Sequence, residues 1–184
     1  CEFIAVKLDP TLAESIVWVP NKSFDFIVPD MAQRKACYAP GAFAGETHTM
    51  TVREPEDDEI YAYRQISLNS HDRHGNMRFY PHAYANFVTR EEPCFYERNA
   101  IDGVVNNQGH GAYPYHSWAG GARNDLEWWL DFGRDVEIDK LVFFLRADFK
   151  HDQNGVPHDS YWKNIDIEFS DGEIIHGEFT LDGS

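Results

Sequence analysis

Apolar and polar residues alternate with a period of two at several places in the first half of the chain. No long segment keeps the i, i+3, i+4, i+7 spacing of an amphipathic helix, so the pattern favours strands over helices. The alternation predicts strands at residues 15–19, 23–28, 47–53 and 60–68. The first two of these are joined by Pro20-Asn21-Lys22, which predicts a β-hairpin.

The second half shows the same alternation. It predicts strands at residues 126–133, 136–149, 164–169 and 174–181, with a turn at Asp171–Glu173 between the last two. Many short strands separated by turn residues are typical of an antiparallel β-sandwich or barrel. The polar, turn-rich segment at residues 69–76 predicts a boundary between an N-terminal β segment or small β domain (residues 1–70) and a second part (residues 71–184).

The order of features from residue 80 onward is more specific. Ala100-Ile101-Asp102-Gly103 precedes a long loop that ends in Ser117-Trp118, and the strand Trp128–Gly133 follows. An apolar strand ending at Arg146 and the sequence EFSDG (residues 168–172) complete the series. Over residues 80–181 this order resembles the discoidin, or F5/8 type C, family.

That resemblance implies a fold and two departures from it. The family fold is an all-β, galactose-binding-like antiparallel β-sandwich of jelly-roll type, used by many carbohydrate-binding modules. The loop after Asp102-Gly103 is longer than is usual in the family, and the late acidic residue and closing strands have no counterpart before Ser184. We therefore expect N-terminal strands to complete the sandwich or the chain to belong to a larger protein with other domains.

The resemblance also implies a structural Ca²⁺ beneath the binding loops. Carried over position by position, the ligands would be the Asp102 carboxylate, the carbonyl groups of Asn99 and Val104, and Asn107 in the place of a threonine. Oxygen ligands of this kind suit a hard cation. The alternative is that Asp102 only caps its own turn through backbone N–H groups.

Residues 104–121 form an uncharged stretch in a chain that is 26% charged. Tyrosine rings can stack on the CH faces of sugars, and histidines can bind their hydroxyl groups, so the stretch predicts a glycan-binding loop. The candidate residues there are His110, Tyr113, Tyr115 and His116. The alternative is that the aromatic residues pack the loop onto the core, which is the role we expect for Trp118.

A second candidate loop begins at Arg146, whose side chain is expected to emerge where an apolar strand ends. Related modules often use an arginine at this place to bind sugar, and hydrogen bonds from a charged group are strong. The candidates here are Arg146, Asp148, His151 and His158. An internal Arg146–Asp148 ion pair is one alternative, and a zinc site is another, although the spacing of the histidines is nonspecific.

The charge of the chain disfavours some classes of binding partner. The chain has 31 acidic and 16 basic residues and a net charge of −15, which disfavours binding to nucleic acid or to an anionic membrane. No apolar run is long enough to span a bilayer. The three cysteines, Cys1, Cys37 and Cys94, match no zinc or disulfide pattern, so we expect free thiols, with a Cys37–Cys94 bridge left open.

These observations favour a non-catalytic carbohydrate-binding module of a larger protein, with an extracellular or cell-surface location. A structural interaction domain without its own ligand is the alternative. An enzyme is disfavoured, because the sequence contains no nucleophile elbow, P-loop, dinucleotide-binding or zinc-protease motif and singles out no pair of carboxylates.

Overall fold

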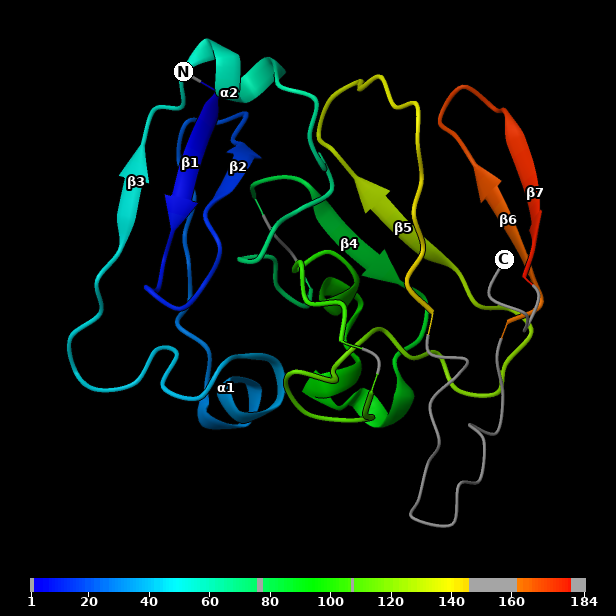
Figure 1. Ribbon diagram of the computed structural model, residues 1–184, viewed down its shortest axis with the longest axis horizontal. Coiled ribbons are helices and arrows are strands. Elements are labelled where there is room, and N and C mark those ends of the chain that lie inside the picture. Colours follow the sequence, from blue (N-terminus) through cyan, green and yellow to red (C-terminus); the bar gives the residue numbers. More distant parts are fainter. Residues whose placement is uncertain (1, 76–77, 107, 146–161, 180–184) are drawn as a thin grey trace. The chain divides into compact units, whose positions relative to one another are not determined.

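The computed structural model describes residues 2–75, 78–106, 108–145 and 162–179 (Figure 1). Contacts divide the chain into two compact units. Unit 1 contains residues 1–106 and 111–141, and unit 2 contains residues 107–110 and 142–184. This division differs from the predicted boundary near residues 69–76, which falls inside unit 1.

A three-stranded antiparallel sheet forms the N-terminal part of unit 1. It consists of β1 (Phe3–Lys7), β2 (Ser15–Trp18) and β3 (Thr51–Arg53), in the order β2-β1-β3 (Figure 1). Burial of apolar side chains at alternate positions stabilises such a sheet. The core cluster beside it comprises Val6, Leu8, Val17, Val19, Cys37, Tyr38, Ala42, Phe43 and Phe79.

Two of the predicted N-terminal strands are wrong. The strand at 15–19 is confirmed as β2, but it pairs with β1, and residues 23–28 form no strand. Their phenylalanines instead pack against the core cluster. Residues 60–68 form no strand either. Their first two residues are the end of α2 (Asp57–Tyr61), which starts with a capping box between Glu56 and Glu59. The cap and the acidic first turn favour a helix over the weak alternation.

The helix α1 (Met31–Cys37) was not predicted from the sequence. The Asp30 side chain caps it by accepting a hydrogen bond of 2.8 Å from the backbone N–H of Gln33. Alanine, glutamine, arginine and lysine in the helix are all strong helix formers. Its short length explains why the apolar spacing gave no signal.

A second sheet of unit 1 pairs β4 (His82–Ala85) with β5 (Trp128–Asp131). Three 3₁₀ turns lie between them in sequence, η1 (Thr89–Glu91), η2 (Pro93–Phe95) and η3 (Glu97–Ala100). An isolated bridge between Trp18 and Tyr80, with hydrogen bonds of 2.8 and 2.9 Å, links β2 to the segment that leads into β4. In the described residues up to 145, the predicted strand at 136–149 is absent.

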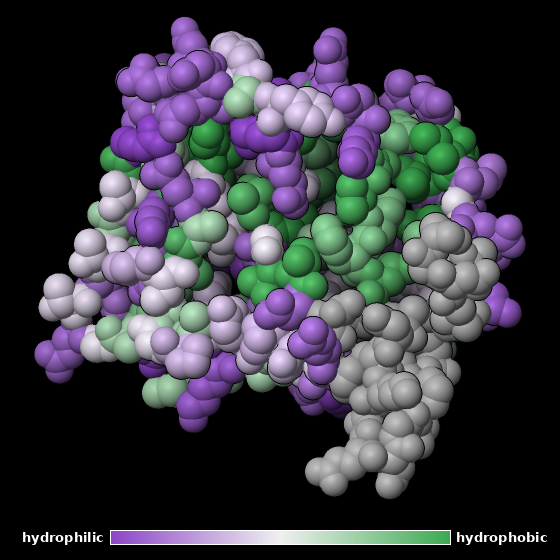
Figure 2. Space-filling model, viewed as in Figure 1, coloured by the Kyte–Doolittle hydropathy of each residue, from purple (hydrophilic) through white to green (hydrophobic). Residues whose placement is uncertain are grey.

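Unit 2 contains the hairpin of β6 (Asn164–Glu168) and β7 (Ile174–Glu178), as predicted. Ile167 pairs with Ile175, while on the other face Asp166 and His176 form an ion pair of 2.6 Å. Hydrophobic residues gather on the surface of this unit (Figure 2). Over the described residues, the sheets of both units are antiparallel and more residues lie in strands than in helices, so the mainly β class is confirmed.

Candidate ligand-binding site

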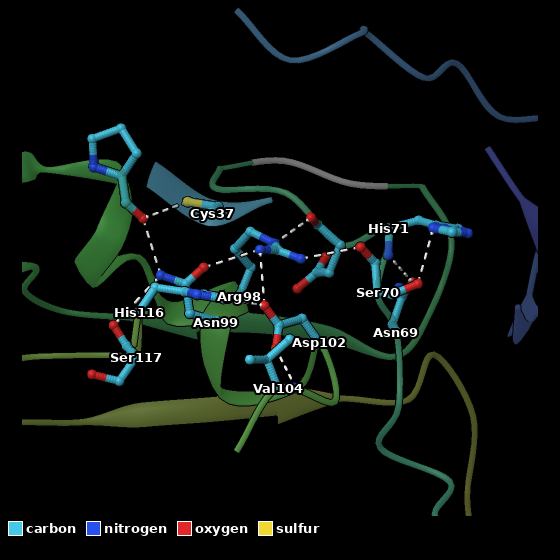
Figure 3. A network of polar contacts seen from close by, with 12 residues as sticks. Cys37, Asn69, Ser70, His71, Arg98, Asn99, Asp102, Val104, His116 and Ser117 are labelled. Carbon is cyan, nitrogen blue, oxygen red and sulfur yellow. Dashed lines mark hydrogen bonds and ion pairs between the residues drawn. The ribbon is translucent and has the colours of Figure 1, made fainter. Parts of the chain in front are cut away.

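Arg98 lies at the centre of a buried polar network in unit 1 (Figure 3). Its Nε donates to the carbonyl oxygen of Asp72 at 2.7 Å, and Nη2 donates to that of Ser70 at 3.1 Å. Nη1 donates to the side-chain oxygen of Asn99 at 3.0 Å and to Oδ2 of Asp102 at 3.3 Å. A buried cation is tolerated only when it is paired and hydrogen-bonded in this way.

Two buried aspartate–histidine pairs flank the arginine. Asp102 Oδ2 lies 2.6 Å from Nε2 of His116, and Asp72 Oδ1 lies 2.5 Å from Nδ1 of His82. Burial raises the pKa of the Asp72 carboxyl, and the hydrogen bond with His82 opposes this shift. The paired residues are ten and fourteen positions apart in the sequence, so each pair holds the two ends of the intervening segment together.

The segment Asn69–Asp72 connects this network to the N-terminal sheet. The side-chain amide of Asn69 donates to the carbonyl oxygen of Pro81 at 2.8 Å. His71 is fully buried, with Nε2 3.0 Å from the carbonyl oxygen of Val6. Burial lowers the pKa of His71 to about 3, and the positive charge of Arg98 acts in the same direction. The polar residues that predicted a boundary therefore form an internal connection within unit 1.

The predicted Ca²⁺ site does not fit this geometry. Oδ1 of Asp102 accepts from the backbone N–H of Val104 at 2.9 Å, which is the turn-capping alternative. Oδ2 of Asp102 is held by Arg98 and His116, and the guanidinium group would repel a bound cation. Among the residues that the structure describes, no group of three or more His, Cys, Asp or Glu side chains could hold a metal ion. Asn107 lies outside the described residues.

The network supports two tyrosine rings. Arg98 lies over the ring of Tyr38, with its Cζ 5.2 Å from the ring centroid. Tyr113 stacks on His116 with centroids 5.6 Å apart, and its backbone N–H donates to the carbonyl oxygen of Ala36 at 2.8 Å. This hydrogen bond attaches the loop that carries Tyr113 to α1. Arg98 therefore positions the ring of Tyr38, and His116 positions the ring of Tyr113.

An open pocket of about 480 Å³ lies beside these rings. It is bounded by one face of α1, the loop that follows the helix, and Tyr113. The loop turns through Gly41 and Gly45, whose φ angles of +92° and +87° favour glycine. The lining residues are Met31, Arg34, Lys35, Tyr38, Ala39, Pro40, Gly41, Ala42, Ala44, Gly45 and Tyr113. The volume falls within the range of small-molecule sites.

The predicted ligand residues are only partly brought together. Tyr113 lines the pocket, whereas Tyr115 is half-buried outside it. The assignment of His116 to ligand contact requires correction, because the side chain is buried in its pair with Asp102. His110 is exposed and belongs to unit 2. The remaining candidates, Arg146, Asp148, His151 and His158, lie outside the described residues.

Of the eleven residues that line the pocket, only Tyr113 was predicted from the sequence, and four of those missed share one helical face. Met31, Arg34, Lys35 and Tyr38 occupy positions i, i+3, i+4 and i+7, which lie on one face of a helix. The signal available in the sequence was the N-cap Asp30 after Pro29, followed by helix-forming residues. That signal locates the helix but not the loop that closes over its face.

Comparison of the chain with protein-family models, with curated proteins and with solved structures found no match. Neither α1 nor any other helix in the described part of the chain has the length and apolar character needed to cross a membrane. We therefore infer a function from the pocket and the network that supports it.

Proposed function

We propose that the chain is a non-catalytic carbohydrate-binding module and that a sugar binds in the pocket between α1 and Tyr113. The observation that carries this proposal is the pocket itself, in which the half-buried ring of Tyr113 stacks on His116 of the buried network and Tyr38 is a buried part of the lining. A rigid aromatic ring such as that of Tyr113 offers contact area at a low cost in conformational entropy, which suits the apolar face of a sugar.

Binding rather than turnover is proposed because of the chemistry of the lining. The described residues around the pocket include no Asp, Glu, His, Ser or Cys side chain. Hydrolysis of a glycosidic bond generally requires two carboxyl groups on either side of the bond. The pocket instead has an aromatic and apolar lining with two cationic side chains. These groups are sufficient to bind a sugar without cleaving it.

The proposed class is a galactose-binding-like β-sandwich that serves other domains of a larger protein. The antiparallel sheets of unit 1 and their link through Trp18 and Tyr80 support a layered β fold. Of the residues in the uncharged loop, Tyr113 is the one placed in the proposed sugar site. The buried His116 is not part of that site, which is formed by Tyr113 together with α1 and the loop after it.

The test is a glycan array probed with the wild-type chain and with Tyr113→Ala. Loss of the stacked ring is expected to weaken binding about tenfold, the effect of removing an aromatic anchor from a binding site. Tyr61→Ala is the matched control, because Tyr61 is 81% exposed and does not line the pocket. Equal binding by wild type and Tyr113→Ala, or no glycan bound at all, would contradict the proposal.

A second candidate function is that of an interaction domain with no ligand of its own. The observation in its favour is the exposed apolar surface of unit 2, where Val142 is 58% and Phe144 is 66% exposed. Contiguous apolar surface of this kind marks contacts between proteins or domains. This candidate predicts that no glycan binds, and Tyr113-dependent binding on the array excludes it as the sole function.

A further inference from the structure

The pocket differs in charge from the rest of the molecule. The chain has nearly twice as many acidic as basic residues, yet the described residues that line the pocket include Arg34 and Lys35 and no carboxylate. At an ionic strength of about 0.15 M the Debye length is about 8 Å, so exposed charges farther away are largely screened. The lining itself therefore carries positive charge from these two cations.

Within the described part of the chain, neither cation takes part in an ion pair, whereas other arginines, such as Arg53, Arg90 and Arg123, do. The Arg34 guanidinium is held in place because Nη1 donates to the carbonyl oxygen of Phe43, and Nη2 lies 3.7 Å from the Met31 sulfur. Lys35 is exposed at the next position of the helix. Both positive charges are therefore available to a bound anion.

From this geometry we infer that the ligand is an acidic saccharide, with a carboxylate that pairs with Lys35 and Arg34 while its ring lies against Tyr113. This inference rests on the proposed function and adds the charge of the ligand to it. Hydrogen bonds between a cationic donor and a carboxylate are about twice as strong as neutral ones. A neutral sugar would form no ion pair with either cation, whereas a uronic acid residue supplies the carboxylate and an apolar ring face together.

The experiment compares charged and neutral forms of the same sugars. Binding of tetragalacturonic acid, hyaluronan tetrasaccharide and sialyllactose is measured by calorimetry at about 0.15 M salt, beside their methyl esters. We expect at least one acid to bind about tenfold more tightly than its ester. Lys35→Gln should remove that preference and Lys35→Arg should retain it. Lys140→Gln is the matched control, because it removes the same charge from an exposed lysine outside the pocket lining.

The possible failures are distinguishable. If the esters bind as tightly as the acids and Tyr113→Ala abolishes both, the ligand is a neutral sugar, and the inference is wrong while the proposed function stands. If neither these saccharides nor any glycan on the array binds, the proposed function fails and the inference fails with it. If hexaglutamate competes as well as the acidic sugars do, the pocket recognises a carboxylate alone, and the assignment to a saccharide is overturned.

Discussion

Acidification from pH 7 to pH 5 is expected to destabilise the native protein through His71. This side chain is fully buried in unit 1, and it contacts the carbonyl oxygen of Val6 and the hydroxyl group of Ser70. Loss of solvation and the nearby charge of Arg98 lower its pKa from 6.5 to about 3. The native state therefore excludes a proton that the unfolded chain binds readily.

The depressed pKa sets both the sign and the size of the effect. Between about pH 6.5 and pH 3, the unfolded chain carries one more proton at this residue than the native protein. The stability is fully present above pH 6.5 and is lost as the pH falls towards 3. One proton contributes about 1.4 kcal/mol for each pH unit, so the loss between pH 7 and pH 5 is about 2 kcal/mol.

The assay is urea denaturation followed by tryptophan fluorescence at several pH values, for wild type and His71→Gln. The other titrating groups, including those behind the net charge of −15, affect both proteins alike and cancel in the difference. The variant is expected to be less stable at pH 7 but to lose about 2 kcal/mol less than wild type on going to pH 5. Equal losses in the two proteins would show that His71 does not titrate as this reasoning requires.

Three further predictions concern packing and reactivity. Arg98→Met should lower the free energy of unfolding, measured by urea denaturation, by about 3–5 kcal/mol, because it leaves buried acceptors unpaired. An unchanged free energy of unfolding would show that the network is not stabilising. Gly133→Ala should cost more than Gly172→Ala, which is expected to cost about 1–2 kcal/mol. Both glycines have positive φ angles, but an added Cβ would lie 2.5 Å from the Tyr80 ring only at Gly133, so equal losses of thermal stability would contradict the packing there. Burial raises the pKa of the Cys37 thiol to about 12, so Cys37 should react with a thiol reagent at pH 8 only after unfolding. Mass spectrometry locates the modified residue, and rapid modification of Cys37 in the native protein would refute its burial.

Features whose causes are local could be predicted from the sequence. The β6–β7 hairpin was predicted because the alternation at 164–169 and the turn at Asp171–Glu173 lie within a few residues of each other. Gly172 takes the positive φ angle that such a turn needs. Trp128 and Trp129 likewise differ in exposure, as adjacent residues of a strand should. Cys37 and Cys94 are free, as the pattern of cysteines indicated.

Features that depend on distant partners could not be predicted. Alternation marks β2 as a strand, but it carries no information on its pairing with β1 rather than with residues 23–28. Residues 69–76 were predicted to be a boundary from their polar composition, because nothing in the sequence shows that Arg98 donates to the carbonyl groups of Ser70 and Asp72. His116 was chosen as a ligand contact for the same reason, since its partner, Asp102, lies fourteen residues away.

The connection through His71 has a consequence for dissecting the chain. A fragment that begins at residue 71 would keep His71 but lose the carbonyl oxygen of Val6 that His71 contacts. It would also lose most of the apolar side chains that pack around Phe79. The later part of unit 1 thus depends structurally on the first seventy residues, and grafting residues 71–184 alone onto another protein would transplant an incomplete fold. Any transferable version of the pocket must include β1, β2 and α1, because the helix that forms its wall belongs to the part that such a cut removes.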